Sequence, residues 1–174
     1  AQLSRGLGDV YKRQHLELSV LNELNKLGLE YFIYEHPPLR TVEESKALRG
    51  EMHGGHTKNL FLRDKKKKNY LITVNENQKI NLKFLESELS TGRLSFGSPE
   101  RLSQFLGVKP GAVSPLALLN DKHNDVSFFI DHNLLSENIL NFHPLVNHLT
   151  VSIKVTDFKY FLKSQNKFYN EIYF

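Results

Sequence analysis

Hydrophobic residues recur along the chain with two different spacings, and these spacings predict an alternation of helices and strands. Leu16, Val20, Leu24 and Leu27 follow one another at three- and four-residue steps. This is the period of a helix with one buried face. Gly28 then supplies a stop signal, so the first predicted helix ends there.

Short, dense apolar runs bounded by polar residues predict strands. They cover residues 31–34, 59–63, 70–74, 93–96, 126–130, 139–142 and 149–155. The second and third runs lie on either side of a lysine-rich turn, so we expect them to form a hairpin. Residues 50–55 are expected to be loop, and the aromatic residues 168–174 are expected to pack on the body or to fray.

Further helices are predicted along the chain, most of them with a start signal. They cover residues 41–49, 82–89, 98–107 and 156–164. Thr41-Val-Glu-Glu44 is a capping box, and Ser98-Pro99-Glu100 places proline at the first helical position. Residues 108–121 contain two prolines and a glycine, so they cannot form one regular helix.

This irregular alternation of strands and helices, with hairpins as well as crossovers, predicts the fold class. We expect an α+β (mixed α/β) domain in which a central mixed, mostly antiparallel sheet is flanked by helices. Residues 15–174 are expected to form this single domain, with a sizeable core. Residues 1–14 lack a starting Met and a clear period, and we interpret them as a non-native leader.

Composition narrows the possible functions. The 174 residues are 40% hydrophobic and 24% charged, with a net charge of +4, which is ordinary for a soluble globular protein with a mild basic bias. The chain has no cysteine, which excludes disulfides, thiolate metal sites and a cysteine nucleophile. No apolar run approaches the roughly 18 residues of a membrane span, and no signal peptide is visible. We therefore expect a cytoplasmic protein without a membrane partner.

The segment His56–Lys68 carries the most informative chemistry. Lys58 and Asn59 lead into the apolar run Leu60–Leu62, which predicts that Lys58 stands at the start of a strand, beside a pocket. Lys65–Lys68 places four positive charges at the following turn, which favours a polyanionic ligand. On position alone, Lys58 also fits a surface lysine whose stem covers the sheet, and the cluster also fits a solvated turn.

Three further motifs contain residues suited to a binding site. Gly111–Pro115 is a Gly-x-x-x-Pro loop, in which glycine allows backbone N–H groups to approach a ligand and proline stiffens the wall. Phe142-His143-Pro144 ends a predicted strand with a histidine, and His36-Pro37-Pro38 precedes Thr41. Loops and strand-end histidines of this kind are also common structural features.

Other chemistries find little support in the sequence. His53 and His56 are separated by two glycines, but this is not a helical ligand pair, and neither His-Glu-x-x-His nor cysteine ligands occur. We therefore expect no metal site and no cofactor. The chain also lacks a Gly-x-Ser-x-Gly elbow, a Walker loop and a Gly-x-Gly-x-x-Gly motif.

Taken in order, these motifs resemble those of the YbaK/ProX family of trans-editing aminoacyl-tRNA deacylases, over roughly residues 15–162. The similarity is closest to the prolyl-tRNA editing branch, which removes alanine from mischarged proline tRNA, Ala-tRNA(Pro). The resemblance implies the YbaK/aminoacyl-tRNA synthetase-associated domain fold. It also implies hydrolysis of the alanyl ester in trans to the prolyl-tRNA synthetase, a transient partner, with no cofactor.

The resemblance also implies a role for each motif. Lys58, Gly111 and His143 would be catalytic, and water would be activated with help from the substrate's own ribose hydroxyl. The implied substrate-binding residues are His36, Thr41, Asn59, Ala112, Val113, Ser114 and Pro115. The implied tRNA-binding residues are Lys65, Lys66, Lys67 and Lys68. Ala112 and Leu116 replace the family's more usual Ser and Phe, which leaves the size of the substrate open. A Cys-tRNA deacylase of the YbaK type and a non-catalytic tRNA-binding module remain as alternatives.

Overall fold

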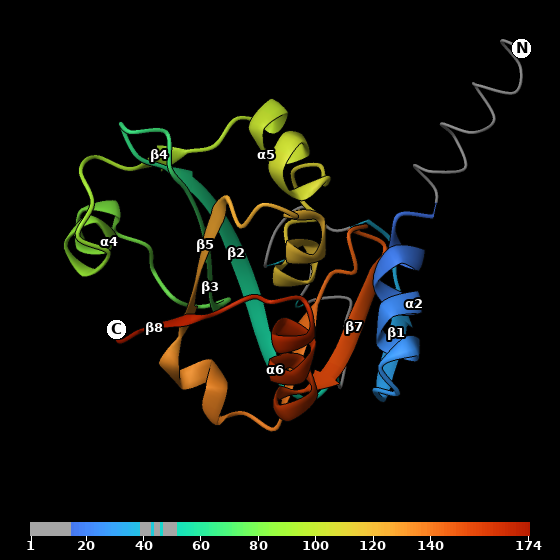
Figure 1. Ribbon diagram of the computed structural model, residues 1–174. Coiled ribbons are helices and arrows are strands. Elements are labelled where there is room, and N and C mark those ends of the chain that lie inside the picture. The colour runs from blue at the N-terminus through green and yellow to red at the C-terminus, as the bar shows by residue number, and fades with distance from the viewer. Residues whose placement is uncertain (1–14, 39–42, 44–45, 47–51) are drawn as a thin grey trace, which may run out of the picture.

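The computed structural model describes residues 15–38, 43, 46 and 52–174. Its described strands form one eight-stranded sheet in the order β1-β7-β6-β2-β3-β5-β8, with β4 paired to β2 (Figure 1). The strands are β1 (Tyr31–Glu35), β2 (Gly55–Arg63), β3 (Asn69–Asn75), β4 (Ser95–Phe96), β5 (Val126–Asp131), β6 (Ile139–Phe142), β7 (Leu149–Lys154) and β8 (Asn170–Ile172). The helices are α2 (Glu17–Lys26), α4 (Leu82–Glu88), α5 (Pro99–Leu106) and α6 (Val155–Ser164), with 3-10 helices η1 (Pro115–Asn120) and η2 (His132–Ser136).

The sheet is mixed, with antiparallel pairs in a small majority. Strand pairs β1–β7, β6–β7, β2–β3 and β2–β4 are antiparallel. Pairs β2–β6, β3–β5 and β5–β8 are parallel. The prediction of a mixed, mostly antiparallel sheet flanked by helices is therefore confirmed.

Two helices begin at the residues that their capping signals indicate. The Asn81 side chain accepts hydrogen bonds from the backbone N–H groups of Lys83 and Phe84 at the start of α4. The Ser98 hydroxyl accepts one from Arg101 N–H at the start of α5. These bonds satisfy N–H groups that have no partner within the helix. Gly107, with φ +67°, ends α5 in the left-handed conformation that glycine adopts easily.

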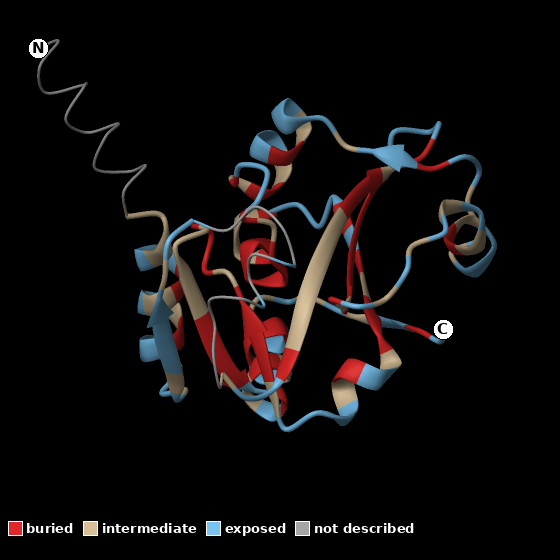
Figure 2. Cartoon of the chain, turned by 180° about the vertical axis from the view of Figure 1, so that it is seen from behind, coloured by how far each residue is buried: buried red, intermediate tan, exposed pale blue. Residues whose placement is uncertain are grey.

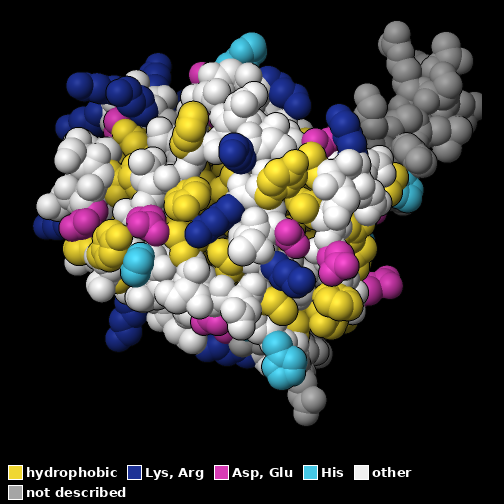
Figure 3. Space-filling view, turned by 60° about the horizontal axis from the view of Figure 1, so that its bottom comes forward, with side chains coloured by type: hydrophobic (Ala, Val, Ile, Leu, Met, Phe, Trp, Pro, Cys, Tyr) yellow, Lys and Arg dark blue, Asp and Glu magenta, His cyan; other side chains and the backbone are white. Residues whose placement is uncertain are grey.

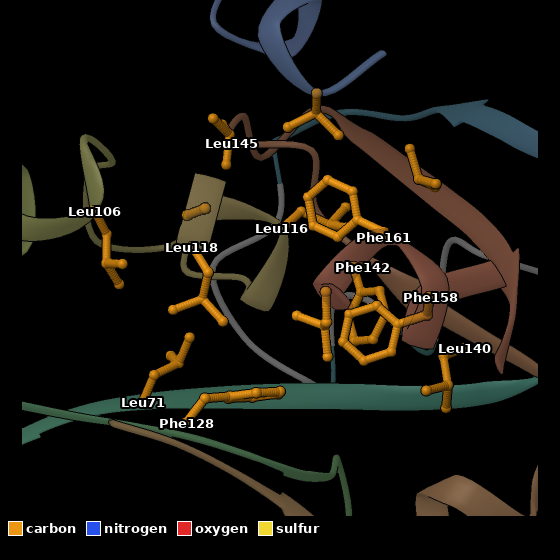
Figure 4. Close-up of a cluster of buried hydrophobic side chains, with 14 of the residues drawn as sticks. Leu71, Leu106, Leu116, Leu118, Phe128, Leu140, Phe142, Leu145, Phe158 and Phe161 are labelled. Carbon is orange, nitrogen blue, oxygen red and sulfur yellow. The ribbon is translucent and has the colours of Figure 1, made fainter. Parts of the chain in front are cut away.

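Each face of the sheet has its own hydrophobic core. The larger core lies under α2, α5, α6 and η1, where Phe142 and Phe158 pack with ring centroids 4.8 Å apart (Figure 4). The smaller core lies on the other face and includes Leu62 and Ile72 of the sheet and Leu85 of α4. This second core covers only the β2–β3–β5 side of its face. The β1–β7–β6 side has no helix of the smaller core over it.

Strand β2 belongs to both halves of the sheet, but it pairs with β6 through two residues only, Gly55 with Leu140 and His56 with Asn141. The close approach at this junction depends on glycine. A Cβ atom on Gly54, whose φ is +103°, would lie 2.8 Å from the Ile139 carbonyl oxygen, and one on Gly55 would lie 2.9 Å from Leu140 Cδ2. Beyond this short ladder β2 and β6 separate.

The structure corrects three details of the predicted elements. Strand β2 begins at Gly55, so Lys58 is its fourth residue and not its first. Residues 170–172 pack on the body, as predicted, but they do so as a strand, β8, which is a parallel partner of β5. Strand β7 ends at Lys154, and α6 starts directly at Val155. Of the predicted helix 41–49, Glu43 and Lys46 are described, and both are helical.

No helix in the described part of the chain is both long enough and apolar enough to cross a membrane.

Candidate active site

The register of the strands gathers polar side chains on one face of the sheet. Paired residues point to the same face, as do residues two apart along a strand. Asn141 pairs with Ser152 on β7 and with His56 on β2. Lys58 and Thr150, each two residues from one of these, therefore share their face. Val151 and Phe142 point the opposite way, into the larger core.

This polar face is the one that α6 leaves uncovered. Figure 2 looks onto it and shows exposed and half-buried residues along β1 and much of β2, whereas the far end of β2 is buried. Polar side chains on a half-face that none of the helices α2, α4, α5 and α6 covers, next to a hydrophobic half-face, are suited to binding a polar ligand. We therefore place the candidate active site here.

A small pocket lies where β2 and β6 separate. Its lining residues are His56, Thr57, Asn59, Glu76, Asn141, Phe142, His143 and Thr150. The pocket brings together Asn59 and His143, two predicted site residues that are far apart in the sequence. Lys58 lies beside it on β2.

His143 is held in one orientation by the backbone. Its Nδ1 lies 2.8 Å from the Leu149 carbonyl oxygen. Because a carbonyl can only accept, Nδ1 carries the proton, and Nε2 of the neutral ring is left as an acceptor. Burial lowers the pKa of His143 below its ordinary value, and the charge on His36 lowers it further, although the bond to Leu149 opposes both effects. The neutral form is therefore favoured at pH 7.

His36 is attached to the same site through Thr150. Its Nδ1 donates to the Pro37 carbonyl oxygen at 2.9 Å, and its Nε2 is hydrogen-bonded to the Thr150 hydroxyl at 2.8 Å. The ring centroids of His36 and His143 are 6.0 Å apart. Two of the motifs found in the sequence therefore meet at the end of β6.

The polar residues of this face also bind one another. The Asn141 amide donates to the carbonyl oxygens of His53 and Gly55, at 3.0 and 3.3 Å, and its Oδ1 accepts from the Ser152 hydroxyl. On the opposite face of the sheet, the Thr73 hydroxyl donates to Asn59 Oδ1 at 2.5 Å. These bonds fix the side chains that surround the pocket.

The Gly111–Pro115 loop lies close to the connection between β6 and β7. A Cβ on Gly111, whose φ is +91°, would have Asn147 Nδ2 as its neighbour at 3.8 Å. Ala112 shares a second pocket with Val146 and His148 of that connection. Val113 packs on the larger core, and Ser114 and Pro115 are buried. The Ser114 hydroxyl accepts a hydrogen bond from Leu116 N–H at 3.1 Å.

The lysine turn is at the opposite end of β2, about 17 Å along the strand from Asn59. Lys65, Lys66, Lys67 and Lys68 are all exposed. Arg63 and Arg93 line a groove with Lys65 and Lys67. In Figure 3, the densest group of Lys and Arg side chains is at the upper left, on the side where Figure 1 draws this end of β2. The turn is therefore strongly basic.

Asp64 anchors this basic turn. Its carboxylate accepts hydrogen bonds from Lys68 N–H and from the Tyr70 hydroxyl, both at 3.0 Å. Burial by itself would raise the pKa of Asp64, but these hydrogen bonds outweigh burial and hold the pKa below its ordinary value. Burial, together with the bond to Asp64, raises the pKa of Tyr70 to about 12.

Several residues of the site were missed in the sequence. They are His56, Thr57, Glu76, Asn141, Thr150 and Ser152, with Arg63 and Arg93 at the basic turn. A usable signal was present, because Thr150 and Ser152 alternate with Val151 and Ile153 along one strand. Thr41 lies outside the described residues. Among the described residues, no group of three or more His, Asp or Glu side chains could hold a metal ion.

Comparison with known proteins defines the class. A model of the aminoacyl-tRNA editing domain family matches residues 36–161. The prolyl-tRNA editing protein ProX of Acetoanaerobium sticklandii is 35% identical over 155 residues, which are 88% of this chain and 94% of ProX. The prolyl-tRNA synthetase associated domain-containing protein 1 of mouse is 36% identical over 154 residues, covering 86% and 90% of the two chains.

A solved structure described as a candidate trans-editing enzyme for prolyl tRNA synthetase shares the fold. It superposes with a TM-score of 0.66 at 19% identity, over 90% of this chain and 95% of its own. With this fold and the family match, the chain belongs to the aminoacyl-tRNA editing domain family. It is an aminoacyl-tRNA deacylase, and the resemblance inferred from its motifs is confirmed.

Proposed function

We propose that this deacylase hydrolyses the ester between alanine and the terminal adenosine of proline tRNA, in trans to the prolyl-tRNA synthetase. The observation that carries the proposal is the 35% identity to ProX, a protein named for prolyl-tRNA editing, over almost the whole length of both chains. A synthetase pocket built for proline admits alanine, so a second enzyme with the opposite size limit is needed.

The residues of the polar face suit the chemistry of this ester. The Lys58 ammonium offsets the negative charge that develops on the carbonyl oxygen, or holds the terminal phosphate. The free Nε2 of His143 accepts a hydrogen bond from the attacking water or from a ribose hydroxyl of the substrate. Asn59, which lines the same pocket from the opposite face of β2, orients the ester. No side chain of the protein needs to form a covalent intermediate, because the ribose hydroxyl helps to activate water.

The other predicted residues take supporting roles in this proposal. Gly111 and Ala112 lie beside the β6–β7 connection and not in the lining of this pocket. In the proposal they limit the size of the amino acid from that side, and Val113–Pro115 hold the loop against the interior. His36 and Thr41 form the rim. Lys65–Lys68 contact tRNA phosphates at a distance from the ester. The enzyme works in the cytoplasm, together with the charging of tRNA.

One assay tests the substrate. Purified protein is incubated with proline tRNA charged with alanine, serine or cysteine, and release of each amino acid is measured against the rate without enzyme. We expect alanine to be released fastest. Preferential release of cysteine would instead assign the protein to the YbaK branch, and release of none would leave a tRNA-binding module.

The pKa of His143 predicts the pH dependence of the reaction. The neutral ring is the active form, and its pKa is lowered. Activity should therefore stay level as the pH falls through about 6.5, the ordinary value for histidine, and decline only further down. His36→Gln should move this decline to higher pH, because the charge that helps to lower the His143 pKa is removed. The measurement is kcat/KM from pH 5 to 8, with exposed His123→Gln as control. An unchanged pH profile in His36→Gln would show that His36 does not influence the titration of His143.

The lysine turn should govern tRNA binding more than the chemical step. Replacing Lys65–Lys68 by serine should reduce the slope of log Kd against log salt, by about 0.7–0.9 for each phosphate that the turn no longer neutralises. Single-turnover rates at saturating tRNA should change little. Serine at four other exposed lysines, Lys26, Lys83, Lys122 and Lys163, is a control with the same net charge. Equal salt slopes in the two variants would mean that Lys65–Lys68 form a solvated turn without a special role in tRNA binding.

A further inference from the structure

We infer that the Glu76 carboxylate binds the α-ammonium group of the aminoacyl moiety. The inference deepens the proposed function, because it assigns a recognition residue for the same ester substrate. Every aminoacyl-tRNA carries this cationic group next to the ester that is cut. None of the residues assigned above offers it an anionic partner.

The backbone fixes Glu76 at the pocket. It directly follows β3, and its N–H donates to the His56 carbonyl oxygen at 2.9 Å, which extends the β2–β3 ladder by one pair. Glu76 is 8% exposed. Among the described residues that line the pocket, it alone carries a carboxylate. A buried carboxylate at the edge of a small polar pocket attracts a cationic ligand group.

Glu76 and Lys58 have the spacing that the substrate requires. Lys58 on β2 pairs with Val74 on β3, and Glu76 lies two residues after Val74, in the extension of β3. The two charged residues are therefore diagonal neighbours on one face, with Cβ atoms about 7–8 Å apart. An aminoacyl ester placed between them presents its ammonium group to Glu76 and its carbonyl oxygen to Lys58. The positive ammonium group of the substrate then faces the Glu76 carboxylate, and the negative charge that develops on the carbonyl oxygen faces the Lys58 ammonium group.

A hydroxy-acid substrate isolates this interaction. Lactate differs from alanine only by a hydroxyl in place of the ammonium group, so lactyl-tRNA keeps the shape of alanyl-tRNA but lacks its positive charge. Single-turnover kcat/KM is measured at pH 7 for both substrates with the wild-type protein, Glu76→Gln and Glu76→Asp. Exposed Glu88→Gln on α4 controls for the loss of one charge, and thermal unfolding controls for folding.

A hydrogen bond to a charged group predicts a change of about 10- to 100-fold. The wild-type protein should cleave lactyl-tRNA that much more slowly than alanyl-tRNA. Glu76→Gln should lose the same factor on alanyl-tRNA and almost nothing on lactyl-tRNA, and Glu76→Asp should recover part of the loss.

Two results would overturn the inference. Equal losses on both substrates would make Glu76 a general base or a structural residue. Equal cleavage of the two substrates by the wild-type protein would exclude ammonium recognition without any variant. If alanyl-tRNA is not a substrate but another aminoacyl-tRNA is, only the proposed specificity fails, and Glu76 is tested with the matching hydroxy acid.

Discussion

Lys58→Ala should lower the single-turnover rate of alanyl-tRNA deacylation by about 100-fold or more, while the protein remains folded. The removal of one donor to a developing oxyanion typically costs about 10²- to 10³-fold in rate. Lys58 is the fourth residue of β2, on the polar face that also carries His56 and Asn141. A strand fixes its position more rigidly than a loop would, so the positive charge needs no rearrangement during the reaction.

The Lys58 variants must separate charge from packing. Lys58→Met keeps the aliphatic stem over the sheet and removes only the ammonium group, so it should be as inactive as Lys58→Ala. Exposed Lys83→Ala on α4 should retain wild-type activity. Thermal unfolding is measured for each variant. Near wild-type turnover in Lys58→Met would remove the ammonium group from the mechanism.

The wild-type protein should cleave alanyl-tRNA(Pro) at least about 100-fold faster than prolyl-tRNA(Pro). A hydrophobic pocket separates ligands that differ by one methylene by only about 1–3 kcal/mol when the smaller one is unwanted. Exclusion of a larger ligand is stronger, because overpacking a rigid wall is costly. Rejection of proline should therefore exceed any preference between alanine and serine. Equal cleavage of alanyl- and prolyl-tRNA would defeat the size-exclusion model.

Gly111→Ala should reduce alanine turnover by about 10-fold. Gly111 has φ +91°, a conformation that residues with a Cβ rarely adopt, so alanine would shift the loop and its N–H groups. Gly92→Ala is the matched control, since Gly92 has an ordinary φ and open space around its Cβ position. Rates with alanyl- and seryl-tRNA measure the effect. If the two variants behave alike, the Gly111 backbone does not shape the site.

Sequence patterns predicted the elements well where local signals decide them. Ser98 lies where α5 begins, and Gly107 lies where it ends. Strand β8 was missed because three residues near the chain end carry no periodic signal, and only the open edge of β5 makes them a strand. The start of β2 was misplaced since Gly54 and Gly55 are typical of loops. In the structure, the lack of a Cβ atom on these two glycines allows β6 to approach β2 closely.

The candidate site could be predicted only in part, because much of it also depends on pairing between distant strands. Lys58 and His143 were found from short motifs, but the polar residues between them became visible only through strand pairing. Glu76 follows a strand and precedes a turn, so its place opposite His56 depends on the β2–β3 register. Such long-range pairing leaves little trace in any single stretch of sequence.

The two-residue ladder between β2 and β6 makes the sheet mechanically uneven. Because the backbone pairing across this junction is so short, we expect bending of the sheet to concentrate at His56 and Asn141. Amide hydrogens at this seam should exchange with solvent faster than those of the β2–β3 hairpin. The pocket lies over this short ladder, where a small elastic deformation of the sheet would change its width.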